Sequence, residues 1–180
     1  KARGVETFTR NANITVNSGL VVTGIKASDE AFGVKATADS VINLNGSMTI
    51  IQTTEQGEEE NAAKNTDGLY ADYDNAGINV NYKDGAVVNP ENVVQIVDDI
   101  YTLSKDEDGV KSKGTVNLAL TNPQSRIRGR FGYRSGEEYG GDEWDPTVIT
   151  YGPGEVNLIL QNGGTWENVQ NYGNEVEEWE

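Results

Sequence analysis

Short apolar segments alternate with polar residues along the chain, and one alternation returns five times. Each copy places Ile, Val or Leu at every second position, mostly with Asn or Thr between them. The five copies are Ile14-Thr15-Val16-Asn17, Ile42-Asn43-Leu44-Asn45, Ile78-Asn79-Val80-Asn81, Val116-Asn117-Leu118-Ala119 and Val156-Asn157-Leu158-Ile159. A period of two is typical of a strand with one buried face. The pattern therefore predicts an all-β chain of short strands.

Two of the copies belong to longer matching units. Gly33-Val34-Lys35-Ala36 leading to Ile42 aligns with Gly68-Leu69-Tyr70-Ala71 leading to Ile78, and Gly109-Val110-Lys111 before Val116 resembles a shortened third copy. The five strand motifs begin 28, 36, 38 and 40 residues apart. Because stacked coils bury faces that one short strand leaves exposed, this pattern predicts a solenoid whose corners accept insertions. A β-sandwich is the alternative, since it also consists of short alternating strands.

Three internal segments interrupt the repeat. Residues 56–67 contain three consecutive Glu and predict an exposed acidic loop. Residues 90–102 follow an Asn cap, begin with Pro and space their apolar residues by three and four, which predicts a short amphipathic helix. Their β-branched residues leave a strand open as the alternative. Residues 121–154 form a long inserted loop with five aromatic residues, and loops of that length are usually functional. Residues 171–180 form an acidic tail.

Composition excludes most catalytic chemistry. The 180 residues include no His and no Cys, and 14 basic against 29 acidic side chains give a formal net charge of −15. A Ser-His-Asp or Cys-His nucleophile and a zinc site of nitrogen and sulfur ligands are therefore excluded. We expect no enzyme activity, no cofactor and no metal site. Since the apolar runs are short, we also expect no membrane contact from this segment.

The repeat units resemble a known class of secreted proteins. Gly68-Leu69-Tyr70-Ala71 leading into Gly77-Ile78-Asn79-Val80, together with the segment from Gly154 to Trp166, is similar to the repeats of bacterial autotransporter passenger domains. The similarity extends over about residues 10–170. It implies a right-handed parallel β-helix that is extracellular, displayed at the outer membrane and often an adhesin. It also implies that residues 1–180 are a single segment of a longer passenger.

Charge is distributed unevenly along the chain. Residues 110–135 carry six basic and no acidic side chains, whereas residues 136–180 carry eleven acidic and no basic ones. Arg126, Arg128 and Arg130 alternate, so an extended strand would place all three on one face. Nearby aromatic rings would stack on sugars or bases. The predicted ligand-binding residues are Arg126, Arg128, Arg130, Tyr133, Arg134, Tyr139 and Trp144.

Two readings of this basic segment stay open. It would bind an anionic glycan or extracellular DNA, whereas the acidic remainder of the chain repels nucleic acid. Alternatively, the segment is neutralised within one folded loop by the acidic residues that follow it. Those acidic neighbours are Glu137, Glu138, Asp142, Glu143 and Asp145.

Neighbouring carboxylates are the remaining candidates for chemistry. Glycoside hydrolases use two carboxyl groups, and the pairs to consider are Asp72 with Asp74, Asp98 with Asp99, and those within residues 137–145. Residues 72–75 and 106–109 carry oxygen ligands at alternate positions but lack a complete calcium-binding loop. In so acidic a chain, such neighbours are also expected by chance.

Together these features predict a surface rather than an active site. The leading hypothesis is a cell-surface adhesin that attaches to a glycan or protein on host or neighbouring bacterial cells, with self-association and biofilm formation as one version. Its coils would form a rigid stalk and residues 121–154 would present the contacts. A carbohydrate-active β-helix enzyme acting on acidic polysaccharide and a purely structural stalk are the alternatives.

Overall fold

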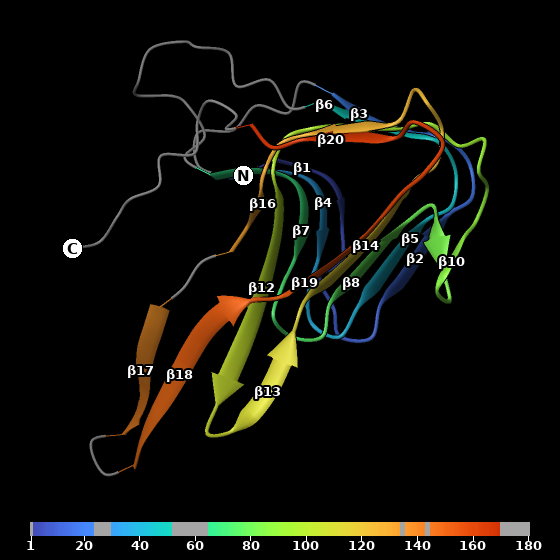
Figure 1. Ribbon diagram of the computed structural model, residues 1–180. Coiled ribbons are helices and arrows are strands. Elements are labelled where there is room, and N and C mark those ends of the chain that lie inside the picture. Colours follow the sequence, from blue (N-terminus) through green and yellow to red (C-terminus); the bar gives the residue numbers. More distant parts are fainter. Residues whose placement is uncertain (1, 24–29, 52–64, 134–135, 143–144, 170–180) are drawn as a thin grey trace.

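The computed structural model describes residues 2–23, 30–51, 65–133, 136–142 and 145–169, and in these residues the chain is all-β (Figure 1). No helix is present in that part of the chain, and hence no long apolar helix of the kind that crosses a membrane. The all-β prediction is therefore confirmed. The predicted acidic tail, 171–180, and most of the predicted acidic loop, 56–67, lie outside the described residues.

Three parallel sheets contain most of the strands. The first sheet is formed by β1 (Ala2–Glu6), β4 (Glu30–Ala36), β7 (Asn65–Ala71), β12 (Ile100–Glu107) and β16 (Phe131–Gly132). The second is formed by β2 (Asn13–Val16), β5 (Val41–Leu44), β8 (Gly77–Val80), β14 (Thr115–Leu120) and β19 (Glu155–Leu160). The third is formed by β3 (Leu20–Thr23), β6 (Met48–Ile51), β11 (Val94–Val97), β15 (Arg126–Arg128) and β20 (Thr165–Glu167).

The chain visits the three sheets in turn and then returns to the first. Each return places a new strand beside the one formed in the previous round, as β4 lies beside β1 and β7 beside β4. The five repeated segments predicted as strands form the whole second sheet, and their first apolar residues, such as Ile42 and Ile78, are level with one another. Val34 is likewise level with Leu69, as the unit alignment predicted. Strands of successive rounds pair in parallel, whereas neighbouring strands of a β-sandwich pair antiparallel.

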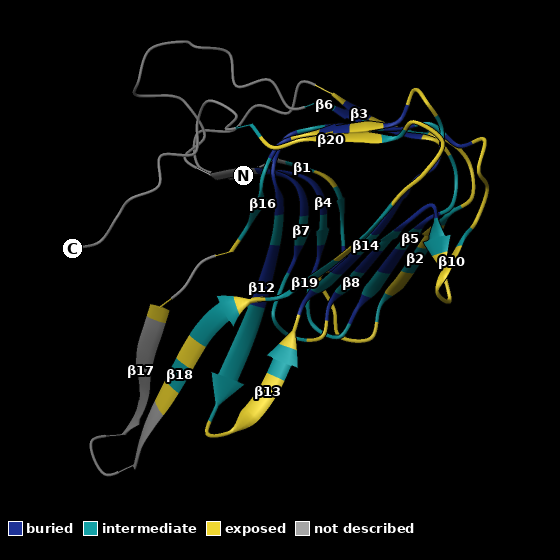
Figure 2. Cartoon of the chain, in the orientation of Figure 1, coloured by how far each residue is buried: buried dark blue, intermediate teal, exposed yellow. Residues whose placement is uncertain are grey.

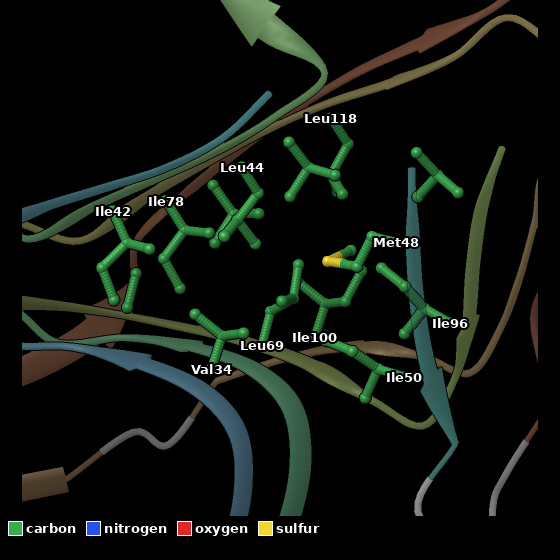
Figure 3. Packing of buried hydrophobic residues seen from close by; sticks show 14 of the residues in the cluster. Val34, Ile42, Leu44, Met48, Ile50, Leu69, Ile78, Ile96, Ile100 and Leu118 are labelled. Atoms are coloured by element: carbon green, nitrogen blue, oxygen red, sulfur yellow. The ribbon is translucent and has the colours of Figure 1, made fainter. Parts of the chain in front are cut away.

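The core lies between the three sheets (Figure 2). Alternate strand residues point inward, and side chains from all three sheets meet in one cluster (Figure 3). Ile42 and Ile78 of the second sheet, Val34 and Leu69 of the first, and Ile96 of the third are each 0% exposed. Because the same position is apolar in successive rounds, the inward residues form columns along the stack.

An asparagine ladder follows the second sheet on its outer side. In successive strands the side-chain amide of Asn79 donates to Asn43 at 2.8 Å, that of Asn117 donates to Asn79 at 2.7 Å, and that of Asn157 donates to Asn117 at 2.9 Å. Asn43 continues the series to Asn13 at 3.2 Å. The Asn residues that recur in the sequence motif therefore bond to one another from strand to strand.

Removing one step of this ladder should have a measurable cost. Asn79 bonds on both sides, so Asn79→Ala should lower the free energy of unfolding by about 1–2 kcal/mol, since a hydrogen bond contributes about 1 kcal/mol. Urea denaturation measures the change. Gln124→Ala is the matched control, because this exposed amide side chain has no hydrogen-bond partner among the described residues. Equal stability of both variants and the unaltered protein would contradict a stabilising ladder.

The predicted helix at 90–102 is wrong. This segment contains β11 and the start of β12. In β11 the side chains of Val94 and Ile96 are buried and those of Gln95 and Val97 are half-buried, which is a period of two. Ile96 is level with Ile50 on one side and Ile127 on the other. The segment therefore forms a strand that pairs on both sides, although its apolar spacing also fits a helix. Its β-branched residues favour the strand.

The predicted third repeat copy at 109–111 is also wrong. Ile100 takes the place beside Leu69, and Asp108 and Gly109 form the turn of a hairpin with φ of 51° and 82°. This hairpin joins β12 to β13 (Val110–Lys113). An Asp-Gly pair that adopts positive φ at both positions favours such a turn.

A second hairpin pairs with the first and completes an antiparallel sheet outside the stack. It consists of β17 (Gly136–Asp142) and β18 (Asp145–Pro153), and β18 lies beside the outer half of β12. We call the four strands β13, β12, β18 and β17, in that order, the projecting sheet. In Figure 1 it extends away from the three parallel sheets. A smaller hairpin, β9 (Tyr82–Lys83) with β10 (Ala86–Val87), lies at another corner.

Residues 121–154, predicted as one inserted loop, divide into two parts. The first part contains β15 and β16, which belong to the parallel sheets. The second part contains β17 and β18 of the projecting sheet. The segment that leaves the stack is therefore shorter than the sequence analysis expects, and it has a partner in residues 103–113.

Candidate ligand-binding site

Two of the predicted arginines lie together on the outer side of the third sheet. Arg126 and Arg128 are exposed and flank Ile127, which is 0% exposed and belongs to the core. Arg126 lies between Gln95 and Thr165 of the neighbouring strands. The alternation of β15 thus places two cations on one exposed face, as expected for positions 126 and 128.

Arg128 has an acidic partner in the next round of the chain. Arg128 Nε lies 3.6 Å from Glu167 Oε2, and both side chains are more than half exposed. For Arg126 the described part of the chain offers no ion pair and no side-chain hydrogen bond. The side chains of the predicted acidic neighbours at 137–145 lie outside the description. Neutralisation within the loop therefore stays a prediction.

Arg130 has a different place from the other two. β15 ends at Arg128, and Arg130 binds Asp99 of the preceding round. Its backbone N–H donates to Asp99 Oδ1 at 2.8 Å, and Nη2 and Nε donate to Asp99 Oδ2 at 3.0 and 3.3 Å. Asp99 is only 3% exposed. The guanidinium therefore compensates a buried carboxylate and does not share the face of Arg126 and Arg128.

The predicted aromatic residues are only partly placed. Tyr133 follows β16 and is 52% exposed. Tyr139 pairs with Val148 through its backbone, and its side chain is not described. Arg134 and Trp144 lie outside the described residues. The structure thus brings Arg126 and Arg128 together, and ligand binding by the predicted set stays a prediction.

The Asp98 and Asp99 pair lies in a closed corner between β11 and β12. Asp98 is 2% exposed, and its Oδ1 accepts the Asp99 N–H at 2.7 Å. Its buried Oδ2 has no hydrogen-bond partner among the described residues. Burial raises the pKa of Asp98 to about 8, helped by the charge of Asp99 and opposed by the backbone hydrogen bond. Since neither carboxyl group opens to solvent, this pair has no room to flank a glycosidic bond.

The other carboxylates take local roles. Asp72 accepts the Tyr73 N–H at 2.8 Å, and burial raises the pKa of its carboxyl group. Asp106 accepts the Gly109 N–H at 2.9 Å and so holds the turn of the β12–β13 hairpin. Among the described residues, no three carboxylates lie close enough to hold a metal ion.

A hollow of about 440 Å³ lies on the projecting sheet, where β13, β12 and β18 run side by side. This volume falls within the range of small-ligand sites, about 300–1,000 Å³. Its lining comes from three strands and one corner of the stack. The lining residues are Asn75, Ser104, Lys105, Asp106, Lys111, Ser112, Lys113, Thr150, Tyr151 and Gly152.

Register orders these residues into rows across the three strands. Lys113, Ser104 and Gly152 form one row. A second row lies two positions further along each strand, and it consists of Lys111, Asp106 and Thr150. Since alternate residues share a face, both rows lie on the same side of the projecting sheet.

The row between these two points to the opposite side. It contains Ser112, Lys105 and Tyr151. There the ring of Tyr73 lies 5.4 Å from the ring of Tyr151 and 5.4 Å from Lys105 Nζ. Aromatic contact with the stack thus supports the back of the hollow.

No known protein family, curated protein or solved structure matches this chain. The site must therefore be interpreted from its own side chains.

The hollow was not predicted from the sequence, because its lining residues come from distant segments of the chain. Ser104, Lys113 and Thr150 meet only when β18 pairs with β12. One local signal was present. Asp108 and Gly109 stand between Ser104-Lys105-Asp106 and Lys111-Ser112-Lys113, and an Asp-Gly pair between two such segments is a hairpin signal.

Proposed function

We propose that this chain is a segment of a right-handed parallel β-helix that acts as a cell-surface adhesin. The support is the order in which the chain visits three parallel sheets and returns beside its own earlier strand. Such a stack is rigid along its length, because each round packs on the next. The resemblance to autotransporter passengers extends the proposal to an extracellular module displayed at the outer membrane.

One observation carries the adhesive role. Two hairpins that are separate in sequence pair with each other outside the stack, and β12 itself runs from the first parallel sheet into the projecting sheet. Where burial is described, residues of the projecting sheet are mostly half-buried or exposed, whereas the inner parts of the parallel sheets are buried (Figure 2). A rigid support that holds an exposed sheet away from its axis is suited to contact a surface on a host or bacterial cell.

Attachment to cells tests this proposal. Beads coated with the protein should bind to host epithelial cells or to bacteria. In the test variant, Asn-Gly replaces residues 106–111 and a second Asn-Gly replaces residues 139–148. The remaining pairs Lys105 with Ser112 and Glu138 with Ile149 then flank two-residue turns. We expect bead attachment to fall at least tenfold, because both tips of the projecting sheet are gone.

The control shortens the hairpin at the other corner. Removing Lys83 and Ala86 leaves Tyr82 and Val87 paired around the Asp84-Gly85 turn, and attachment should stay unchanged. Circular dichroism verifies that both variants fold. Unchanged attachment of the first variant would indicate that the projecting sheet is not adhesive, and no attachment of the unaltered protein to either cell type would contradict the adhesin proposal.

A further inference from the structure

Two lysines lie together on one side of the hollow in the projecting sheet. Lys111 and Lys113 are among its lining residues, beside Asp106. Lys105 also lines the hollow, but it belongs to the row that points to the opposite side of the sheet, and it is paired with Glu107. A ligand on this side would therefore meet the ammonium groups of Lys111 and Lys113.

The two lysines on the side shared with Ser104 and Thr150 retain binding capacity. Lys111 Nζ lies 3.5 Å from Asp106 Oδ2, and Lys113 is paired with Glu155. Their side chains are 80% and 56% exposed. Exposed ion pairs contribute little to stability, and each ammonium group has three donors. An anionic ligand can thus bind both lysines at little loss of existing interactions.

Hydroxyl and amide groups surround the lysines. Ser104 and Thr150 lie in the same rows as Lys113 and Lys111, and Asn75 joins them from the corner of the stack. Gly152 stands beside Ser104, where a Cβ would come within 3.2 Å of Ser104 Oγ. A residue without a side chain therefore leaves this place open. The side chains of Ser104, Thr150 and Asn75 can each form hydrogen bonds with the hydroxyl groups of a sugar.

We propose that this hollow binds a saccharide that carries a carboxylate. Lys111 and Lys113 bind the carboxylate, and Ser104, Thr150 and Asn75 bind the sugar hydroxyls. This assignment rests on the proposed adhesin function and names its ligand class. It also places anion recognition on β13, away from Arg126 and Arg128 of the third parallel sheet.

Calorimetric titration with defined probes tests the assignment. The acidic probes are trigalacturonic acid and 3′-sialyllactose, and their uncharged counterparts are the methyl-esterified trisaccharide and lactose. At least one acidic probe should bind at least tenfold more tightly than its counterpart, and more weakly as salt is added. Hexaglutamate, an acidic peptide, should bind at least tenfold more weakly than that acidic saccharide.

Two double variants with equal charge changes locate the site. Lys111→Gln with Lys113→Gln should lower the affinity at least tenfold, whereas Arg126→Gln with Arg128→Gln should change it less than twofold. All four side chains are exposed, so folding is preserved and thermal melting verifies it. The proposal is overturned if neither acidic saccharide binds, if charged and uncharged probes bind equally, if hexaglutamate binds equally well, or if only the arginine variant loses affinity.

Failure here and failure of the adhesin proposal are distinguishable. If no acidic saccharide binds while cell attachment still requires the tips of the projecting sheet, the ligand class is wrong and the adhesin proposal stands. If the unaltered protein attaches to no cell while an acidic saccharide binds at Lys111 and Lys113, the hollow is a saccharide site in a protein that is not an adhesin.

Discussion

Asp98→Asn should stabilise the protein, by on the order of 4 kcal/mol at pH 7. The Asp98 carboxyl group is buried, and one of its oxygens finds no hydrogen-bond partner in the described part of the chain. Burial raises its pKa from 3.8 to about 8. Because the folded-state pKa lies above the unfolded-state value, the folded protein holds the proton more tightly. The stability that this bound proton contributes is complete below about pH 4 and is lost as pH rises toward 8. Over that range the free energy of unfolding falls by about 1.4 kcal/mol per pH unit. Asn is neutral throughout this range and avoids that loss.

Urea denaturation of the two proteins from pH 4 to pH 9 measures this effect. Their free energies of unfolding should converge near pH 4, diverge as pH rises and run parallel above about pH 8. At pH 7 the difference corresponds to about 10 °C in melting temperature. Asp84→Asn is the control, since Asp84 lies exposed in the β9–β10 turn. A difference that does not change with pH would show that the Asp98 carboxyl group does not titrate in this range.

Arg130→Ala should destabilise the protein by about 3–5 kcal/mol, because it leaves the carboxylate of Asp99 buried without its cation. Three hydrogen bonds from Arg130 converge on that carboxylate, and they connect two successive rounds of the chain. Removing the guanidinium removes two of them and the compensating charge. Thermal melting and urea denaturation measure the loss.

A second substitution separates this structural role from ligand binding. With Asp99→Asn in the background, Arg130→Ala should cost at least 2 kcal/mol less, because no buried carboxylate then loses the guanidinium of Arg130. Arg126→Ala, at an exposed position of the same segment, should stay within about 0.5 kcal/mol of the unaltered protein. If Arg130→Ala were as mild as Arg126→Ala, the contact with Asp99 would have no structural importance.

The second parallel sheet was predictable because its signal is local and repeated. In each strand apolar residues such as Ile42 and Leu44 alternate with polar residues that include Asn, and each face of the sheet depends on this alternation. The apolar residues enter the shared core, while the Asn side chains bond to the next strand. The repeat therefore carries information about neighbouring rounds as well as about one strand.

The segment 90–102 was mispredicted because its apolar residues contain both a helical and a strand period. Val93, Val97, Ile100 and Tyr101 fit a helical stripe, whereas Val94 and Ile96 fit a strand. What decides between them is the presence of Ile50 and Ile127 on the neighbouring strands. That information lies more than 30 residues away and is absent from the local pattern.

The site was predictable only where a single strand determines it. Alternation correctly placed Arg126 and Arg128 on one exposed face. It could not place Arg130, because its partner Asp99 lies 31 residues earlier. The hollow forms only when β18 pairs with β12, so the sequence of either strand alone does not predict it.

The asparagine ladder affects which parts of the chain can tolerate insertions and deletions. The amides of Asn43, Asn79, Asn117 and Asn157 are separated by 36, 38 and 40 residues along the chain, yet each reaches the next with a single hydrogen bond. Strand register is thus independent of the length of peptide between one round and the next. Corners can lengthen, shorten or exchange their sequence while neighbouring rounds keep their alignment. Variation is thereby confined to the surface, and the same property makes each corner a natural position for grafting a foreign peptide.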